Sequence, residues 1–165
     1  MRDLFIFACF TALSFVDMKE LTTDEIVEVN GEKWILSKRH KTNVPFQVKL
    51  LDIPLQIIER YKYLSEDMLV FGKINYWTMC KQLKKVMTEC GIEKQISYHC
   101  ARHTFGTLAL SKGMSIESVS RVLGHTNIET TQIYAKITVE KLDNDLTMLG
   151  DKLSKSFGNI KVAGI

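Results

Sequence analysis

The sequence lacks cysteine pairs at the short spacings of a disulfide scaffold. Its four cysteines lie within apolar or helical patterns, at Cys9, Cys80, Cys90 and Cys100. Small disulfide-rich domains instead hold their cysteines at short, paired spacings in loops. A disulfide framework is therefore not expected, and the chain fits a reducing, cytoplasmic setting.

Clusters of metal-binding side chains are scarce as well. Cys90, His99, Cys100 and His103 lie near one another in the sequence, but they contain no C-x-x-C pair. The acidic residues are not grouped as metal ligands either. We therefore expect no bound metal.

A membrane-spanning run is also missing, because a span takes about 20 apolar residues. The apolar opening, residues 4–16, is shorter than that. Asp3 cancels the charge of Arg2, so the cationic start of a secretion signal is absent too. We interpret this opening as one fully buried helix and expect no membrane partner. A chain that begins inside a core helix is typical of a fragment, so we expect an upstream domain to be absent.

The sequence has no large excess of charge of either sign. The 22 Lys and Arg exceed the 19 Asp and Glu by only three, which is too mild to indicate nucleic acid by itself. The distribution is more informative, since residues 33–49 hold a dense basic cluster of the kind that tracks phosphates. The lysines of residues 81–85 are better explained as a solvated face.

The remaining composition is that of one ordinary globular domain, with 45% hydrophobic and 25% charged residues in 165. Residues 26–29 and 34–36 are rich in β-formers and are joined through Asn30-Gly31, a favoured two-residue hairpin turn. A third run, 44–51, contains Pro45, which favours an edge strand. These runs predict a three-stranded antiparallel sheet.

The rest of the chain has helical patterns. Glycines at 91, 113 and 124 are typical of helix ends. The predicted helices are 54–63, 74–90, 97–111, 115–123, 130–135 and 139–149. The fold class is therefore mainly α with a small three-stranded antiparallel β-sheet (α+β).

One helix start has the chemistry of an anion site. Ser97 is a plausible N-cap, and it puts His99 and Arg102 on one face near the positive end of the helix. Arginine and imidazole both donate hydrogen bonds to phosphate oxygens. An H-x-x-R pair alone is more often structural than catalytic. We assign His103 a structural role, with its side chain pointing away from Arg102, and we expect Leu108 in the core.

Residues 97–137 together indicate a protein family far more specifically than that pair alone. The text SYHCARHTFGTLALSKGMSIESVSRVLGHTNIETTQIYAKI strongly resembles the C-terminal catalytic box of the tyrosine recombinase (phage integrase) family, with H-x-x-R, then LGH, then a tyrosine after TT. The resemblance covers nearly the whole chain. It implies the tyrosine recombinase catalytic-domain fold.

The resemblance also implies the roles of five residues. Tyr134 falls on the nucleophile, His99 and Arg102 on the family's histidine and second arginine, and His125 on the histidine of LGH. Lys41 falls on the hairpin lysine that serves as general acid toward the leaving 5′ oxygen. The reaction that these roles imply gives a 3′-phosphotyrosyl linkage and conserves bond energy, so no cofactor is expected.

At one position the chain departs from the family. Ser14 stands where the first arginine is expected, three residues before Asp17, which falls on the family's acidic position. Serine cannot supply the missing charge. Some integrases of mobile elements from Bacteroides-type bacteria are similar in lacking this arginine, and RDLFIFACFTALSFVDMKEL resembles their sequence. We hypothesise that Arg39, two residues before Lys41, reaches the scissile phosphate instead.

The family implies double-stranded DNA as partner, a homotetramer on DNA, accessory DNA-bending proteins as further partners, and a bacterial, nucleoid-associated cytoplasmic location. Residues 1–150 would form the catalytic domain. Residues 151–165 would form a tail exchanged between subunits, anchored by Leu153, Phe157, Ile160 and Val162.

Two alternatives stay open. Residues 115–123 and the helix before them resemble a helix-turn-helix, so a DNA-binding relative with a degenerate active site is the first. A type IB topoisomerase, which shares the nucleophile chemistry, is the second.

Overall fold

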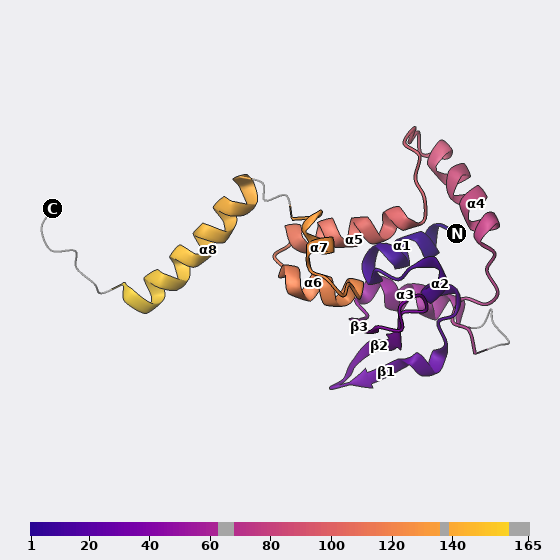
Figure 1. The fold of residues 1–165 in the computed structure, drawn as a ribbon, viewed down its shortest axis with the longest axis horizontal. Coiled ribbons are helices and arrows are strands. Elements are labelled where there is room, and N and C mark those ends of the chain that lie inside the picture. The colour runs from indigo at the N-terminus through magenta and orange to yellow at the C-terminus, as the bar shows by residue number, and fades with distance from the viewer. Residues whose placement is uncertain (63–67, 136–138, 159–165) are drawn as a thin grey trace, which may run out of the picture. The chain divides into compact units, whose positions relative to one another are not determined.

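The computed structural model describes residues 1–62, 68–135 and 139–158 (Figure 1). The chain divides into two compact units, Met1–Ala135 and Lys136–Ile165, and each is described by itself. Among the described residues, no helix is both long enough and apolar enough to cross a bilayer.

The apolar opening forms two helices, so the prediction of one continuous helix was wrong. Helix α1, Arg2–Thr11, ends where Ala12 adopts a left-handed conformation with φ 57°. Helix α2, Phe15–Lys19, then begins at Ser14, whose hydroxyl accepts a hydrogen bond from the Asp17 backbone N–H. The break leaves the Ala12 carbonyl free for partners outside the helices.

The three-stranded antiparallel sheet is confirmed, with strand order β1-β2-β3. A short 3-10 helix, Thr23–Glu25, leads into β1, Ile26–Val29, which pairs with β2, Glu32–Lys38, and this pairs with β3, Pro45–Lys49. Asn30 and Gly31 have φ of 53° and 78°, as the predicted two-residue turn requires. Pro45 opens the edge strand β3, again as predicted.

Among the described residues, the helices after the sheet agree with the prediction in number and order, while several ends differ. Gly91, Gly113 and Gly124 all have positive φ at helix ends. Ser97 is not an N-cap, because the fifth helix begins two residues later without a side-chain cap. The helices are α3, Asp52–Tyr61; α4, Tyr76–Glu89; α5, His99–Ser111; α6, Ile116–Leu123; α7, Glu129–Gln132; and α8, Val139–Phe157.

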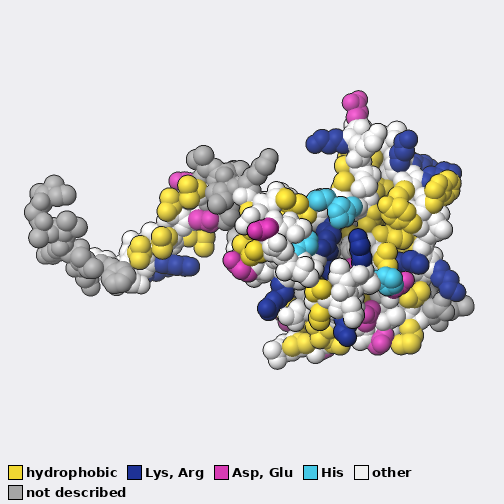
Figure 2. Space-filling model, in the orientation of Figure 1, with side chains coloured by type: hydrophobic (Ala, Val, Ile, Leu, Met, Phe, Trp, Pro, Cys, Tyr) yellow, Lys and Arg dark blue, Asp and Glu magenta, His cyan; other side chains and the backbone are white. Residues whose placement is uncertain are grey.

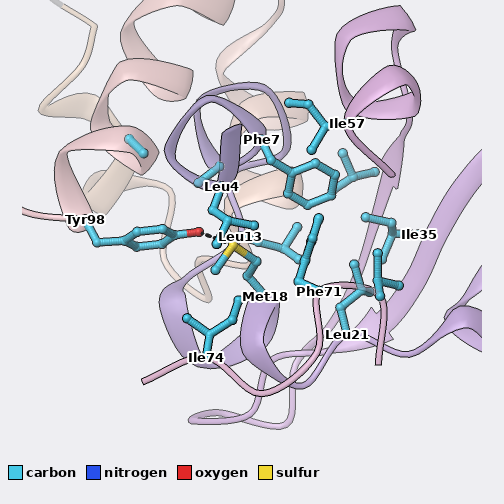
Figure 3. Close-up of a cluster of buried hydrophobic side chains, with 14 of the residues drawn as sticks. Leu4, Phe7, Leu13, Met18, Leu21, Ile35, Ile57, Phe71, Ile74 and Tyr98 are labelled. Carbon is cyan, nitrogen blue, oxygen red and sulfur yellow. Dashed lines mark hydrogen bonds between the residues drawn. The ribbon is translucent and has the colours of Figure 1, made fainter. Parts of the chain in front are cut away.

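The main core lies where α1 and the sheet meet α3 and the segment before α4 (Figure 3). Phe7 is fully buried and packs edge-on against Phe71, with ring centroids 4.8 Å apart. The Tyr98 hydroxyl donates to the Met18 sulfur at 2.9 Å. Because α1 also packs along α5, this core holds the start of α5 against the break after α1.

A second, smaller core joins α5 to α6. It contains Ala12, Leu110, Val119 and Leu123, all buried. Leu108 is 40% exposed, so its predicted place in the core was wrong. This cluster positions the last turn of α6, and with it the LGH segment, against the end of α1.

The second unit contains α8, which continues to Phe157 instead of ending at residue 149 as predicted. Its exposed leucines, Leu142, Leu146, Leu149 and Leu153, recur at helical spacing along one face. Of the other predicted tail anchors, Ile160 and Val162 lie outside the described residues, as does the side chain of Phe157.

Candidate active site

A buried ion pair joins the β2–β3 turn to the start of α2. Asp17 accepts a hydrogen bond from Arg39 Nη1 at 2.8 Å, and both side chains are almost fully buried. The carboxylate also accepts from the His40 backbone N–H at 2.9 Å and from Ser14 Oγ at 2.8 Å. Burial would raise the pKa of Asp17, but these donors outweigh it and leave the pKa below its ordinary value.

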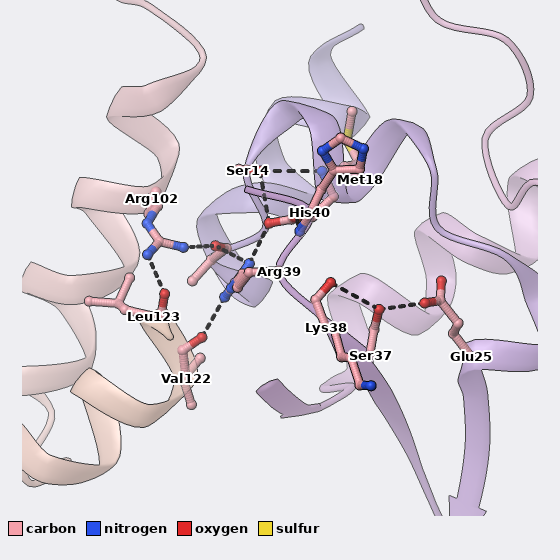
Figure 4. A network of polar contacts seen from close by, with 12 residues as sticks. Ser14, Met18, Glu25, Ser37, Lys38, Arg39, His40, Arg102, Val122 and Leu123 are labelled. Carbon is pink, nitrogen blue, oxygen red and sulfur yellow. Dashed lines mark hydrogen bonds and ion pairs between the residues drawn. The ribbon is translucent and has the colours of Figure 1, made fainter. Parts of the chain in front are cut away.

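The same guanidinium spans the gap between the turn and α6 (Figure 4). Arg39 Nη2 donates to the Val122 carbonyl at 2.5 Å, and its guanidinium carbon lies 3.9 Å from the centre of the Phe46 ring. A Cβ on Gly124 would come within 3.0 Å of Arg39 Cγ and Nε. The glycine is therefore needed both for its φ of 64° and for the passage of this arginine.

Arg102 meets Arg39 at one backbone oxygen. Arg102 Nη1 donates to the Ala12 carbonyl at 3.0 Å, and Arg39 Nη1 lies 3.5 Å from the same oxygen. Arg102 Nη2 donates to the carbonyl of Leu123. Burial, with a smaller effect of the Arg39 charge, lowers the pKa of Arg102 to about 10, so Arg102 stays charged at neutral pH.

His125 lies beside these charges, directly after Gly124. Its Nδ1 is 2.9 Å from the hydroxyl of the fully buried Thr131, which leaves Nε2 as the nitrogen for other partners. Burial lowers the pKa of His125, and the charges of Arg102 and Arg39 lower it further. His125 also lines a groove of about 560 Å³ between the start of β3 and the end of α6.

Tyr134 follows α7 and lies against α5. A Cβ on Gly106 would come within 2.8 Å of Tyr134 Cδ2, so only glycine admits the ring at this distance. The Tyr134 hydroxyl is 2.8 Å from His103 Nδ1. Burial raises the pKa of Tyr134, and the charge of Arg102 opposes this rise.

His103, which was expected to point away from Arg102, faces Tyr134. Its ring meets Tyr134 at a centroid distance of 5.4 Å and meets the ring of His99, one turn earlier on α5, at 4.5 Å. Burial lowers the pKa of His99, and His103 and Arg102 add to this effect. The two histidines and the tyrosine thus form a row along α5.

Lys41 occupies a different environment from the other candidates. It is exposed in the β2–β3 turn, which closes through the Arg39 N–H to the Val44 carbonyl at 2.8 Å and the Asn43 N–H to the Arg39 carbonyl at 2.7 Å. Within the described part of the chain, no hydrogen bond or ion pair joins Lys41 to the other candidate residues. The structure therefore brings together Arg39, Asp17, Ser14, Arg102, His99, His125 and Tyr134, and leaves Lys41 at the rim.

The surface over this site is rich in cationic and imidazole side chains. Figure 2 shows histidines and basic residues gathered over the middle of the first unit. No group of three or more His, Cys, Asp or Glu that could hold a metal occurs among the described residues. The two arginines beside Tyr134 offer charge stabilisation of an anion next to a phenol.

A protein-family model matches most of the chain. The model of the phage integrase family matches residues 2–141. The chain belongs to the phage integrase family. Its predicted family resemblance is thus confirmed, while the resemblance to integrases of Bacteroides-type elements stays a prediction.

Curated relatives of this phage integrase chain are tyrosine recombinases. It is 47% identical over 118 residues to tyrosine recombinase XerD of Listeria monocytogenes serotype 4b, which covers 68% of the chain and 39% of that protein. It is 36% identical over 130 residues to XerA of Saccharolobus solfataricus, which covers 76% of the chain and 43% of that protein. The chain spans less than half the length of these two relatives.

Solved structures confirm the predicted fold. The XerH site-specific recombinase in a post-cleavage complex with its palindromic difH substrate matches with a TM-score of 0.70 at 22% identity, covering 90% of this chain and 45% of that one. The Tn1549 transposon integrase, in complex with a circular intermediate DNA, matches with a TM-score of 0.70 at 16% identity, covering 88% and 57%. At these identities the likeness concerns the fold.

Proposed function

We propose that this chain cuts and rejoins double-stranded DNA as a site-specific recombinase, with Tyr134 as the covalent nucleophile. The observation that carries this proposal is the meeting of Arg39 and Arg102 at the Ala12 carbonyl, in a site that also holds His125 and Tyr134. Two guanidinium groups side by side fit the extra negative charge of a pentacoordinate phosphorus. Membership of the phage integrase family supports the same chemistry.

In the proposed reaction the Tyr134 oxygen attacks the scissile phosphorus. The oxygen–phosphorus bond forms a 3′-phosphotyrosyl linkage, the bond to the 5′ oxygen breaks, and Lys41 donates a proton to that leaving oxygen. Arg39, Arg102, His99 and His125 stabilise the charge on the non-bridging oxygens. One phosphodiester is exchanged for another, so the reaction needs no metal or nucleotide cofactor.

Arg39 takes the part of the arginine that Ser14 replaces. Its guanidinium is paired with Asp17, the acidic residue at the family's position beside the missing arginine. Ser14 instead donates to Asp17, so it supports the carboxylate that holds Arg39. The charge is thus supplied from the β2–β3 turn rather than from the start of α2.

A second candidate is a DNA-binding relative without catalysis. Arg39 itself favours it, because the residue is only 5% exposed and its Nη atoms donate to Asp17 and to backbone carbonyls. An arginine held in this way could serve the fold alone. This candidate predicts binding that weakens with salt and leaves no covalent product.

Assembly on DNA as a homotetramer is a further part of the proposal. The leucine face of α8 is exposed along about three turns of helix, and we propose that it packs against a second copy of the chain. We propose the catalytic domain at residues 1–150 and an exchanged tail from residue 151, with α8 running across that boundary. Accessory DNA-bending proteins and a nucleoid location belong to the same proposal.

Capture of a covalent product tests the proposed function. The chain would be incubated with a pool of nicked duplexes of randomised sequence, and the denaturant-resistant protein–DNA fraction would be sequenced. We expect a fraction enriched in one DNA sequence, and its loss in Tyr134→Phe. Retention of the pool without any resistant fraction would favour the non-catalytic relative.

A further inference from the structure

His103 contacts the reacting oxygen of the proposed nucleophile. Its Nδ1 lies 2.8 Å from the Tyr134 hydroxyl, an ordinary distance for a hydrogen bond to a neutral ring nitrogen. We infer that His103 is the general base that accepts the phenolic proton of Tyr134 during strand cleavage. The inference rests on the proposed function and adds a residue that the family resemblance did not assign.

The other histidines are arranged for different contacts. His125 Nδ1 is 2.9 Å from the Thr131 hydroxyl, and His40 is exposed and lies 3.3 Å from a Glu20 carboxylate oxygen. His99 lies edge-on to the His103 ring, at a centroid distance of 4.5 Å. Among the described residues, His103 is the imidazole within hydrogen-bond distance of the phenol.

The contact is positioned by the packing of Tyr134 against α5. Gly106, one turn after His103 on α5, lets the tyrosine ring lie directly on the helix. The rings of His103 and Tyr134 meet at 61°, and the phenol hydroxyl lies at hydrogen-bond distance from Nδ1. A base held in this geometry needs no rearrangement to take the proton, which is the geometric requirement for general base catalysis.

His103, Tyr134 and Lys41 account for every proton that moves in the proposed reaction. His103 begins neutral, with its proton on Nε2 and the Nδ1 lone pair facing the phenol. The phenolic proton moves to Nδ1, the oxygen keeps the electron pair and forms the bond to phosphorus, and the 5′ oxygen leaves with a proton from Lys41. In rejoining, the 5′ hydroxyl attacks phosphorus, Lys41 recovers its proton, and His103 returns its own to Tyr134.

Two substitutions separate proton transfer from mere positioning. His103→Asn keeps a polar group near the Nδ1 position but is not basic, whereas His103→Ala removes both properties. If His103 is the base, both variants should form the covalent adduct at least ~10²-fold more slowly than the wild type, at unchanged melting temperature. His103→Asn is the informative variant if His103→Ala is unstable.

A substrate with sulfur at the bridging 5′ position separates the base from the acid. Its thiolate leaves without a proton, so Lys41→Ala should recover near wild-type adduct formation on it. The His103 variants should stay slow on the same duplex, because the phenol must still lose its proton. Lys41→Ala is the matched control, since Lys41 is exposed in a turn.

The outcomes distinguish the inference from the proposed function. Near wild-type cleavage by His103→Asn would show that the residue only positions the phenol, and recovery of the His103 variants on the sulfur substrate would assign it to the leaving group. Either result overturns the inference while leaving Tyr134 as nucleophile. An absence of adduct from the wild type on both substrates would overturn the proposed function instead.

Discussion

At the scale of single residues, one of the two guanidinium groups of the proposed site comes from the β2–β3 turn. Arg39 and Asp17 lie 22 positions apart and are joined by a buried ion pair at 2.8 Å. Breaking such a pair by removing one partner leaves a buried charge uncompensated, which typically costs about 3–5 kcal/mol. Any test of Arg39 in catalysis must therefore separate lost charge from lost stability.

Restoring the family's arginine provides that separation. Arg39→Ala should reduce adduct formation by ~10²-fold or more and lower the melting temperature. Adding Ser14→Arg to Arg39→Ala returns a guanidinium to the position that the family uses, beside Asp17, and should recover much of the adduct formation. The rate of covalent capture and thermal melting would be measured on the same preparations.

Arg39→Lys is the matched control, because it keeps the charge without the planar fork of donors. If Arg39→Ala cleaves DNA at the wild-type rate, the arginine serves the fold alone. Recovery of adduct formation only in proportion to the recovery of stability, across Arg39→Ala, Arg39→Lys and the Ser14→Arg double variant, would also count against a direct role in the reaction.

The lowered pKa of Asp17 has a consequence for stability in acid. A carboxylate whose pKa is lower in the folded than in the unfolded chain stabilises the fold above its ordinary pKa of 3.8, and this contribution is lost as the pH falls through the folded value. We therefore expect the free energy of unfolding to fall below about pH 4. Urea unfolding at several pH values should show a shallower fall for Asp17→Asn; equal slopes would contradict the assignment.

At the scale of elements, Gly106 makes α5 the surface on which Tyr134 rests. A Cβ there would meet the ring at 2.8 Å, so Gly106→Ala should displace the phenol from His103 and slow adduct formation. Alanine is otherwise about 1 kcal/mol more favourable than glycine inside a helix. The substitution should therefore not unfold the protein through helix propensity.

Gly150→Ala in α8 is the matched control, since nothing lies within 4 Å of its added Cβ. It should raise helix stability and leave adduct formation unchanged. Wild-type cleavage by Gly106→Ala would mean that the reacting tyrosine leaves its place on α5. Circular dichroism melting and covalent capture measure the two effects.

Much of this element structure was predictable from local signals. Asn30-Gly31 sets a turn by its positive φ values, and Gly124 ends α6 in the same way. The break between α1 and α2 was missed, although Ser14 and Asp17 carry a capping signal, because apolar residues surround it and dominate the pattern. The left-handed Ala12 has no sequence signal; its carbonyl instead accepts hydrogen bonds from two arginines of later elements.

Local spacing in the sequence also made part of the site predictable. His99 and His103 are four residues apart on a helix, so they share a face, and this spacing could have indicated His103. Its contact with Tyr134 depends on the path of the chain after α7, which local spacing does not describe. The exposure of Leu108 likewise depends on which side of α5 the neighbouring helices α1 and α6 cover.

At the scale of the whole molecule, the exposed leucine face of α8 is the surface that we propose for assembly. Replacing Leu146 and Leu149, 57% and 49% exposed, with glutamine should abolish assembly of several copies on one DNA duplex. Mass photometry on DNA would measure it. Lys152→Gln, one exposed polar change in the same helix, should have no effect. Unchanged assembly of the leucine variant would contradict exchange through α8.

The identity of the residue joined to DNA tests the central claim most directly. The covalent product from the enriched duplex would be digested with nuclease and protease and sequenced by mass spectrometry. The account predicts a nucleotide on Tyr134, linked through its 3′ phosphate and accompanied by a free 5′ hydroxyl on the other fragment. A nucleotide on another residue, a 5′ linkage, or bound DNA with no modified peptide would contradict it.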